Sequence, residues 1–534
     1  MNSSSVEKGA GMDAHRRVAP SFIKVFPVGK GFSCFDFVDD RFDELGSLRR
    51  CFSLARSFGF RTLVVESILP DGLIREENEE LTALFSDYAA GSLVRLTFWR
   101  SAFRAPNGVD ASETEDLIGF AIAKCDNVPS RKLHEWHLFD AVFRKYEHEH
   151  NCLPCMRPHR IRVVERELQI SGRLYCQQND LNKSCAQVAL RSLLSGRLPT
   201  GDISYRRINE LARPAGRPQW VPANGLSTMQ IRRVLDQLHI GHRDINYPET
   251  EKTDPEIRRT HPFQKFVYAG VESGAGALLG FSMAGPGLNV PGKHMIPFFG
   301  HTFNKDTWVP DAEQSYFDVG GGLGYIPSEC WTSSFLGHDD NFGPNFCVPR
   351  LYIRPEQVDY VSELLPDSAF FSGVQAETVS IRFVYSLRPM FLKTTNRWLL
   401  RLAHYSRPDI HNVILRAVCV PKNLYVAHLK NVKDWDGHAE NPKLPDLLAE
   451  LLPACLWVVE VSIPHLFQAN ERKLGEVVLD ASRPLASADP LSFDSFRLAR
   501  VPTRYLLVGT VKKGTPQFIE VPSSIESHVP LLRL

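Results

Sequence analysis

Cys185 is the residue whose position most clearly suggests covalent chemistry. It opens a run whose apolar residues have the spacing of an amphipathic helix, with Asn182 or Ser184 as the expected cap: Ala186, Ala189, Leu190, Leu193 and Leu194. The partial positive charge of a helix N-terminus favours the thiolate, which is the nucleophilic form of cysteine. A lone cysteine at such a place is more often a buried structural residue, so the prediction depends on a partner for the thiol.

A histidine and an aspartate further along the chain supply such a partner. Residues 292–317 are expected to form a strand that begins near His294, a polar turn at 304–306 and a return strand that ends near Asp311. In a hairpin the start of one strand faces the end of the other, so these two side chains can meet. A carboxylate that accepts from the imidazole Nδ1–H leaves Nε2 to take the thiol proton.

Rival residues exist for both roles. His301 lies on the same expected strand as His294, but an offset of seven residues places it on the opposite face if the pairing is regular. Asp306 is the rival orienting residue, and it lies in the turn, where aspartate usually bonds to the backbone. For the oxyanion, the amide side chains of Gln178 and Asn179 precede the cysteine by seven and six residues, and either could act with the Cys185 backbone N–H.

Two other stretches concentrate polar and metal-binding residue types. His338, Asp339 and Asp340 could line a cleft or bind a cation, although loops often gather such residues without function. A Cys-x-x-Cys pair lies at 152–155 among the histidines of residues 148–159 and could form half of a zinc site, which stays open because no second pair of this kind exists. We assign no metal and no organic cofactor to the predicted reaction.

Length and composition indicate a globular protein of several domains. A chain of 534 residues exceeds one hydrophobic core, and 23% charged residues with a net charge of +1 provide no global field for nucleic acid or an anionic membrane. The N-terminus lacks the apolar segment of a secretory signal, and eleven scattered cysteines are typical of a reducing compartment, so we expect a cytoplasmic protein. No stretch is apolar enough for a membrane span.

Local patterns divide the chain into four parts. We expect an α+β multidomain protein with a disordered tail (1–20), an α/β accessory domain (21–158), a central domain (159–350) and a β-rich accessory domain (351–534). Within the first domain, apolar spacings of three and four predict a helix over 132–148. Within the last, alternation predicts a strand over 379–387.

The segment from about 165 to 320 resembles papain-like cysteine peptidases, most closely the bacteriocin leader-peptidase type. The resemblance rests on an extended Gln-containing segment, the Cys185 helix, a second helix from Ser227, and the sequences HMIPFFGH and TWVPDA around the histidine and the aspartate. It implies a papain-like fold with Cys185 as nucleophile, His294 as base and Asp311 as orienting residue. Gln178 lies one residue farther from the cysteine than the family spacing, and Ala186 replaces the usual glycine.

The expected function is that of a cysteine peptidase or isopeptidase. It would cleave an amide bond through a thioester, with a protein or peptide substrate, after a small residue such as Gly or Ala in a flexible tail. The same residues would serve a deamidase or an acyltransferase, and an inactive papain-like scaffold is a further alternative. The walls of its cleft would come from residues near Gln178 and from an aromatic loop with Trp308, Tyr316 and Trp331. A site for charged substrates at His338, Asp339 and Asp340 also stays open. Neither nucleic acid nor a membrane is an expected partner.

Overall fold

The computed structural model describes most of the chain. The residues described are 22–146, 151–213, 224–249, 254, 262–283, 292–303, 317–320, 322–407, 409–485, 494–512 and 515–533. They form three large sheets with helices packed against them, so the expected mixed α/β character is confirmed. Among these residues, no helix combines the length and the apolar character that crossing a membrane requires. The expected tail, Asp311 and Asp306 lie outside the described residues.

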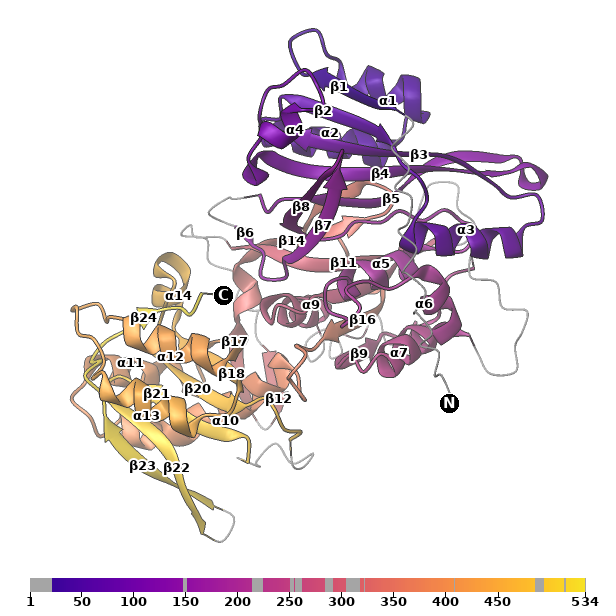
Figure 1. The fold of residues 1–534 in the computed structure, drawn as a ribbon. Coiled ribbons are helices and arrows are strands. Elements are labelled where there is room, and N and C mark those ends of the chain that lie inside the picture. The colour runs from indigo at the N-terminus through magenta and orange to yellow at the C-terminus, as the bar shows by residue number, and fades with distance from the viewer. Residues whose placement is uncertain are drawn as a thin grey trace, which may run out of the picture.

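The N-terminal part contains a five-stranded antiparallel sheet in chain order, shown in indigo and purple in Figure 1. Its helices supply a buried aromatic cluster that packs on the sheet. The elements are β1 (Ile23–Pro27), α1 (Cys34–Phe42), α2 (Gly46–Ser57), β2 (Thr62–Ser67), α3 (Gly72–Leu84), β3 (Ala89–Trp99), β4 (Leu117–Val128) and β5 (Leu133–Phe143).

The helix predicted over 132–148 is wrong, because most of this segment is strand β5. A tight turn with Lys132 at a φ of 54° returns the chain so that β5 pairs with β4. The end of β5 is buried on both faces, and apolar residues on both faces of a strand imitate helical spacing.

The central sheet has the strand order β15-β14-β11-β10-β16-β9, and β6 pairs with β11. Alternate residues of β10 and β11 belong to two different cores, one with α5 and one with α9, so the two helices cover opposite faces of the sheet. The bounds are β6 (Asn151–Cys152), α5 (Cys185–Leu194), β9 (His242–Asn246), α9 (Phe263–Glu272), β10 (Ala277–Met283), β11 (Gly292–Phe303), β14 (Thr332–Asp339), β15 (Gly343–Pro349) and β16 (Val358–Leu364).

Smaller elements flank the central sheet. A two-stranded hairpin leads from the N-terminal part toward α5, and two helices follow α5 in the chain. These are β7 (Arg157–Val163), β8 (Arg166–Gly172), α6 (Tyr205–Ala212) and α7 (Thr228–Gln237). The α7 helix begins after the Ser227 cap, whose side-chain oxygen accepts from the Gln230 backbone N–H, as the sequence predicts.

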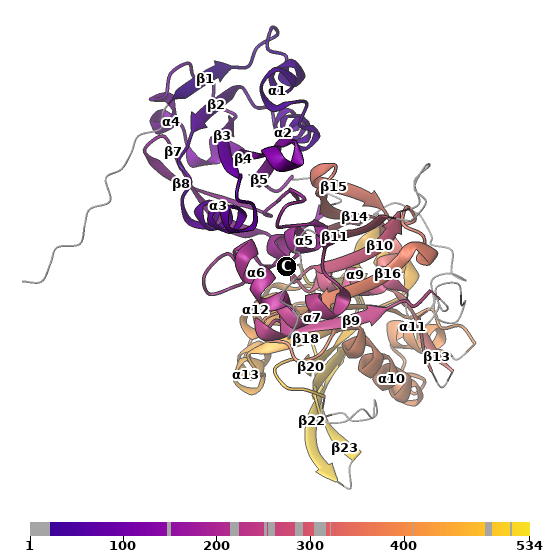
Figure 2. The same cartoon turned by 90° about the vertical axis from the view of Figure 1, so that its right-hand side faces the viewer.

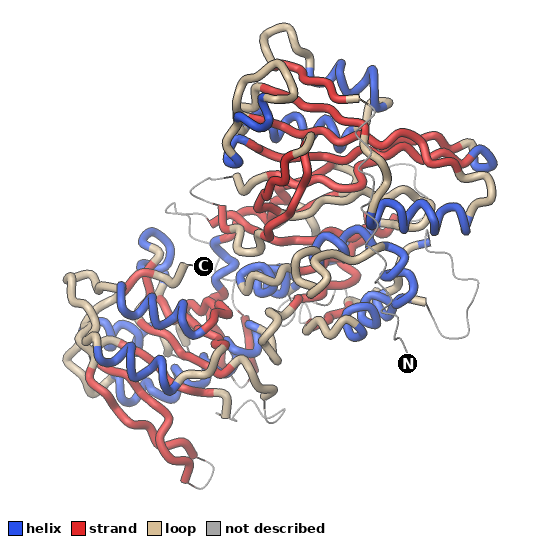
Figure 3. The backbone as a smooth tube through the Cα atoms, viewed as in Figure 1, coloured by secondary structure: helices blue, strands red, loops and turns tan. Residues whose placement is uncertain are grey.

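The third sheet is eight-stranded and carries helices, with the order β12-β13-β17-β18-β20-β21-β22-β23. Its strands are β12 (Phe317–Gly320), β13 (Leu323–Pro327), β17 (Ile414–Pro421), β18 (Cys455–Ser462), β20 (Gly475–Asp480), β21 (Phe496–Val501), β22 (Arg504–Lys512) and β23 (Thr515–Pro522). Its helices are α10 (Gly373–Phe391), α11 (Arg397–Tyr405), α12 (Lys422–Asn431), α13 (Lys443–Leu451) and α14 (Pro464–Asn470). Figure 3 distinguishes the strands and helices of this region by colour.

The strand predicted over 379–387 is wrong, because these residues lie in the middle of α10. The helix begins at a capping box of Ser372 and Gln375, and much of its length is buried in the core shared by the second and third sheets. A helix with core on several sides shows no polar face, so its β-branched and aromatic residues imitated a buried strand.

The second and third sheets exchange strands across the expected boundary at residue 350. Strand β16 lies beyond it in sequence but pairs with β10 in the central sheet, whereas β12 and β13 lie before it and join the third sheet. One continuous hydrophobic core therefore connects the two sheets. Figure 2 shows the N-terminal part at one end of the molecule and the β22–β23 hairpin at the other.

Candidate active site

Cys185 is the first residue of α5. The Ser184 backbone N–H and hydroxyl both donate to Gln187 Oε1, at 3.2 and 2.6 Å, and so fix the start of the helix. The following residues are buried against β11, whereas Cys185 itself is only partly buried. The thiol thus lies at the helix N-terminus in a residue that is not fully buried, which suits a nucleophile.

His294 lies near the start of β11, where it pairs with Phe281 of β10. Its side chain is 4% exposed, its ring lies edge-on to the Phe281 ring of β10 at 5.6 Å, and it lies close enough to Cys185 for the two side chains to interact. The structure therefore brings together the cysteine and the histidine, which are far apart in the sequence.

The carboxylates beside His294 are those of Asp339 and Asp340, at the end of β14. His294 Nε2 lies 3.3 Å from Asp339 Oδ2 and 3.5 Å from Asp340 Oδ1, distances of ion pairs without the alignment of a regular hydrogen bond. The strand that pairs with β11 on this side is β14, not a return strand at 306–317. Because Nε2 faces the carboxylates, Nδ1 is the nitrogen left for the thiol, which reverses the expected use of the two ring nitrogens.

Asp339 is held in one orientation by its own turn. Its Oδ1 accepts from the backbone N–H groups of Asn341 and Phe342, at 2.9 and 3.3 Å, and this leaves Oδ2 directed at the imidazole. Asp339 therefore has the geometry expected of an orienting carboxylate.

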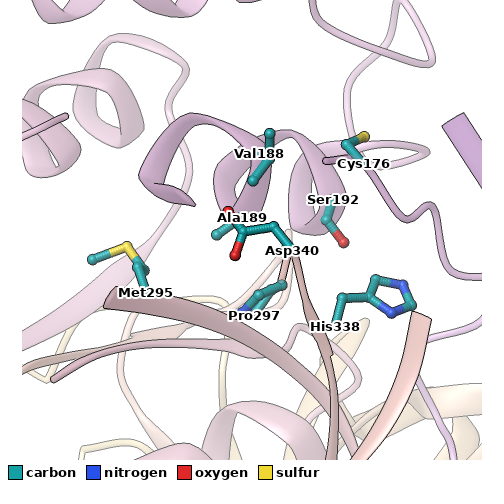
Figure 4. Close-up of a pocket in the computed structure, with 8 residues that line it drawn as sticks. All are labelled: Cys176, Val188, Ala189, Ser192, Met295, Pro297, His338 and Asp340. Atoms are coloured by element: carbon teal, nitrogen blue, oxygen red, sulfur yellow. The ribbon is translucent and has the colours of Figure 1, made fainter. Parts of the chain in front are cut away.

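Asp340 differs from Asp339 because neither of its carboxyl oxygens has a hydrogen-bond partner among the described residues. Figure 4 shows its carboxyl group between α5 and β11, where it lines a cavity of about 10 Å³ together with Ala189 and Pro297. Burial disfavours the charged carboxylate of Asp340 and raises its pKa to about 7. The charge of His294 opposes this rise in pKa, and the charge of Asp339 adds to it.

The surroundings of His294 favour the charged imidazolium. Burial alone would lower its pKa, but the interactions with Asp339 and Cys185 and the nearby charge of Asp340 outweigh burial and raise the pKa to about 10. His294 is therefore protonated at neutral pH and can stabilise a thiolate on Cys185.

The structure separates the two amides proposed for the oxyanion. Asn179 uses both of its N–H groups, toward Asp126 Oδ2 at 3.3 Å and Asn182 Oδ1 at 3.1 Å, so its side chain stabilises the loop. Gln178 is partly exposed, and no hydrogen bond of its side chain occurs within the described ranges. Of the two amides, only that of Gln178 stays available.

The N-terminal part holds the segment that precedes Cys185. The backbone of Tyr175 pairs with that of Ala141 in β5, and Gln177 Oε1 accepts from the Ser47 hydroxyl at 2.7 Å. The Tyr175 hydroxyl also donates to the Asp340 carbonyl at 3.2 Å, in the turn that carries Asp339 and Asp340. The first sheet thus contacts both halves of the candidate site.

A buried ion cluster lies next to this segment and includes Lys183, two residues before Cys185. Glu77 of α3 binds Lys183 Nζ at 2.7 Å through Oε1 and Lys124 Nζ at 2.6 Å through Oε2. Lys124 also pairs with Asp126, and Asp126 is the residue that binds Asn179. These interactions fix the start of α5 relative to the N-terminal sheet. No local sequence motif predicts them, because the residues are far apart in the sequence.

His301 lies near the end of β11, against α9, and takes no part in the cluster around Cys185. Its Nε2 lies 2.8 Å from Glu272 Oε1 of α9, and the Cys152 thiol lies 4.0 Å from the same oxygen. Glu272 Oε2 binds Arg416 at 3.0 Å. The cluster of these four residues, in which Cys152 is only partly buried, connects α9 with the third sheet.

In the part of the chain that the structure describes, three groups of His, Cys and carboxylate side chains lie close enough to hold a metal ion: Cys152, Glu272 and His301; Glu77, Asp126 and His137; His294, Asp339 and Asp340. In the first two groups Arg416 or the lysines already neutralise the carboxylates, which opposes a further cation. In the third, the carboxylates face the imidazole of His294.

Two residues expected at the cleft are structural. His338 is buried against the Phe299 ring at 4.5 Å, and burial lowers its pKa to about 3, so it is neutral. Trp331 is 1% exposed and packs on Phe467 of α14, so it lines no cleft. The other aromatic residues expected there, Trp308 and Tyr316, lie outside the described residues.

The signal that could have identified Asp339 was present in the sequence. The stretch HDDNFG has an aspartate followed by turn residues at the end of a strand, a pattern that fixes a carboxylate. No protein-family model matches this chain, and no curated protein matches its sequence. The assignment of a function therefore depends on the geometry around Cys185.

Proposed function

We propose that this protein is a papain-like cysteine hydrolase that acts on an amide bond of a protein or peptide in the cytoplasm. The observation that carries the proposal is the contact between Cys185 at the start of α5 and His294, whose Nε2 faces Asp339. A Cys-headed helix packed on the strand of the histidine, with an acid on the next strand, is also the arrangement that the family resemblance implies.

The reaction follows from the imidazolium of His294 beside the Cys185 side chain. The Cys185 thiolate attacks the carbonyl carbon, and the oxyanion that forms accepts from the Cys185 backbone N–H and the Gln178 amide. The His294 imidazolium gives its Nδ1 proton to the leaving amine, and the C–N bond breaks to leave a thioester. Neutral His294 then takes a proton from water, whose oxygen attacks the thioester and releases the acid and the thiolate.

The chemistry of the acyl acceptor decides the reaction type. Water gives peptidase or isopeptidase activity on a substituted amide and deamidation on a primary amide, whereas an amine gives acyl transfer. We favour cleavage after a small residue, Gly or Ala, in a flexible tail, because an extended peptide bound through its backbone fits a site on the face of a sheet.

The test is incubation of the protein with a peptide library of diverse tails, followed by mass spectrometry. We expect cuts after small residues with the wild type and none with Cys185→Ala or His294→Ala. Cuts mainly after Lys or Arg would contradict the specificity, and cuts that persist in Cys185→Ala would contradict the assignment of the nucleophile. A mass change of +1 without cleavage would identify a deamidase.

A further inference from the structure

A pocket of about 300 Å³ lies in the C-terminal part of the molecule, on elements that contribute nothing to the site at Cys185. It is lined by residues of α11, α14 and two loops: Arg397, Trp398, Arg401, Trp435, Leu466 and His528. This volume is at the lower end of the range of small-molecule sites. Two tryptophans and two arginines in so small a pocket make a ligand of specific chemistry the natural occupant.

The cationic groups of the pocket lie against aromatic faces. The guanidinium carbons of Arg397 and Arg401, one helical turn apart on α11, lie 5.1 and 4.8 Å from the centre of the Trp398 ring. Within the described part of the chain, neither arginine has a carboxylate at ion-pair distance, and both side chains are exposed. Among the described residues, therefore, no carboxylate holds either guanidinium group, and both can bind an anion.

Two buried rings, those of Trp398 and His528, form part of the wall of the pocket. Trp398 is 8% exposed, and its buried Nε1 has no hydrogen-bond partner among the described residues. His528 packs edge-on against Trp398 at 4.7 Å, and its Nδ1 accepts from Arg472. The burial of His528 and the charge of Arg472 lower its pKa to about 4, so the ring is neutral and carries its proton on Nε2.

The outer wall is an exposed aromatic platform on a fixed loop. Trp435 is 65% exposed, yet its backbone N–H donates to the Ser527 hydroxyl and the His528 carbonyl, at 3.2 and 3.1 Å. Asp434 Oδ2 in turn accepts from the backbone N–H groups of Glu526 and Ser527. The platform is therefore held in place by the backbone, and its ring is presented to solvent.

We propose that this pocket binds a phosphorylated nucleoside, with the base stacked on Trp435 and the phosphate on Arg397 and Arg401. Base stacking on aromatic rings and guanidinium binding of phosphate are the two interactions that these side chains provide best. The pocket has room for one such unit. The shared chemistry could come from a free nucleotide or from the end of a nucleic-acid strand, and the experiment separates the two.

The experiment is a titration of full-length Cys185→Ala protein with ADP, followed by tryptophan fluorescence and calorimetry. This background removes the proposed peptidase activity, so the outcome does not depend on that proposal. We expect saturable quenching by ADP, with binding at least tenfold weaker for adenosine and for inorganic phosphate, each of which keeps half of the contacts. Tighter binding of a 5′-phosphorylated oligonucleotide than of ADP would identify a strand end as the source.

Three variants test the position of the site. Arg397→Ala/Arg401→Ala and Trp435→Ala should each weaken ADP binding at least tenfold, whereas Arg232→Ala, which removes an exposed arginine of α7, should leave it unchanged. Thermal unfolding of each variant confirms that the fold is kept. Absence of saturable binding at millimolar ADP, or equal affinity of the pocket variants and the Arg232→Ala control, would overturn the proposal.

Discussion

Asp339 faces His294 with one carboxylate oxygen and the backbone of its own turn with the other. The distance from Oδ2 to the imidazole Nε2 is 3.3 Å, while Oδ1 accepts from Asn341 and Phe342. Because the backbone holds this carboxylate in place, the carboxylate can hold the His294 imidazole in one orientation. It follows that the orienting role belongs to Asp339 in our account, although the sequence favours Asp311.

The two aspartates can be separated by substitution. Asp339→Asn should lower kcat/KM on the order of 10²-fold, because an amide keeps the turn but no longer stabilises the imidazolium. Asp311→Asn should leave the activity near that of the wild type. Steady-state kinetics on the peptide identified from the library measures both, and the reverse order of effects would restore Asp311 to the role.

The pH dependence of the reaction follows from His294. Its pKa of about 10 means that the leaving amine is protonated by an imidazolium that is present up to that pH and lost above it. We expect kcat/KM to fall as the pH rises through about 10, and to fall at a lower pH in Asp339→Asn. A descending limb in the same place in both enzymes would contradict the ion pair.

Asp340 should make the fold more stable in acid than at neutral pH. Its pKa in the folded protein, about 7, exceeds the ordinary value of 3.8. Between these two pH values the folded state therefore binds more protons than the unfolded state, and it loses stability as the pH rises. Asp340→Asn removes this loss of stability. The free energy of unfolding of the variant, taken relative to that of the wild type, should therefore be higher at pH 8 than at pH 4 by on the order of 2–4 kcal/mol. Urea unfolding at both pH values measures the difference, and parallel curves would contradict it.

The sequence allowed prediction of those parts that depend on local signals. The start of α5 at Cys185 and of α7 after Ser227 could be predicted, because caps and apolar spacing are local. Strand β5 and helix α10 could not, because both are buried on more than one side, and burial removes the periodicity on which the prediction depends. The partner of His294 was missed because it lies on β14, a strand whose pairing with β11 no local pattern specifies.

The buried ion cluster of Glu77 should be needed for stability. Burial disfavours its charge, but Lys124 and Lys183 outweigh burial and hold the pKa of Glu77 below its ordinary value, so the carboxylate stabilises the fold at neutral pH and this effect is lost in acid. Glu77→Gln leaves two buried lysines without their partner and should cost about 3–5 kcal/mol. Urea unfolding measures this cost. Glu79→Gln, an exposed neighbour on α3, should change it by less than about 0.5 kcal/mol. Similar effects of the two substitutions would show that the cluster contributes nothing special.

The reactivity of Cys185 tests the central claim most directly, because it requires no knowledge of the substrate. The measurement is the rate of iodoacetamide alkylation near neutral pH, resolved by peptide mass spectrometry, with the exposed Cys347 as internal reference. We predict that Cys185 reacts at least about tenfold faster than Cys347, and that His294→Ala removes most of this difference while leaving Cys347 unchanged. Equal rates for the two cysteines, or a Cys185 rate that does not respond to the loss of His294, would contradict the account.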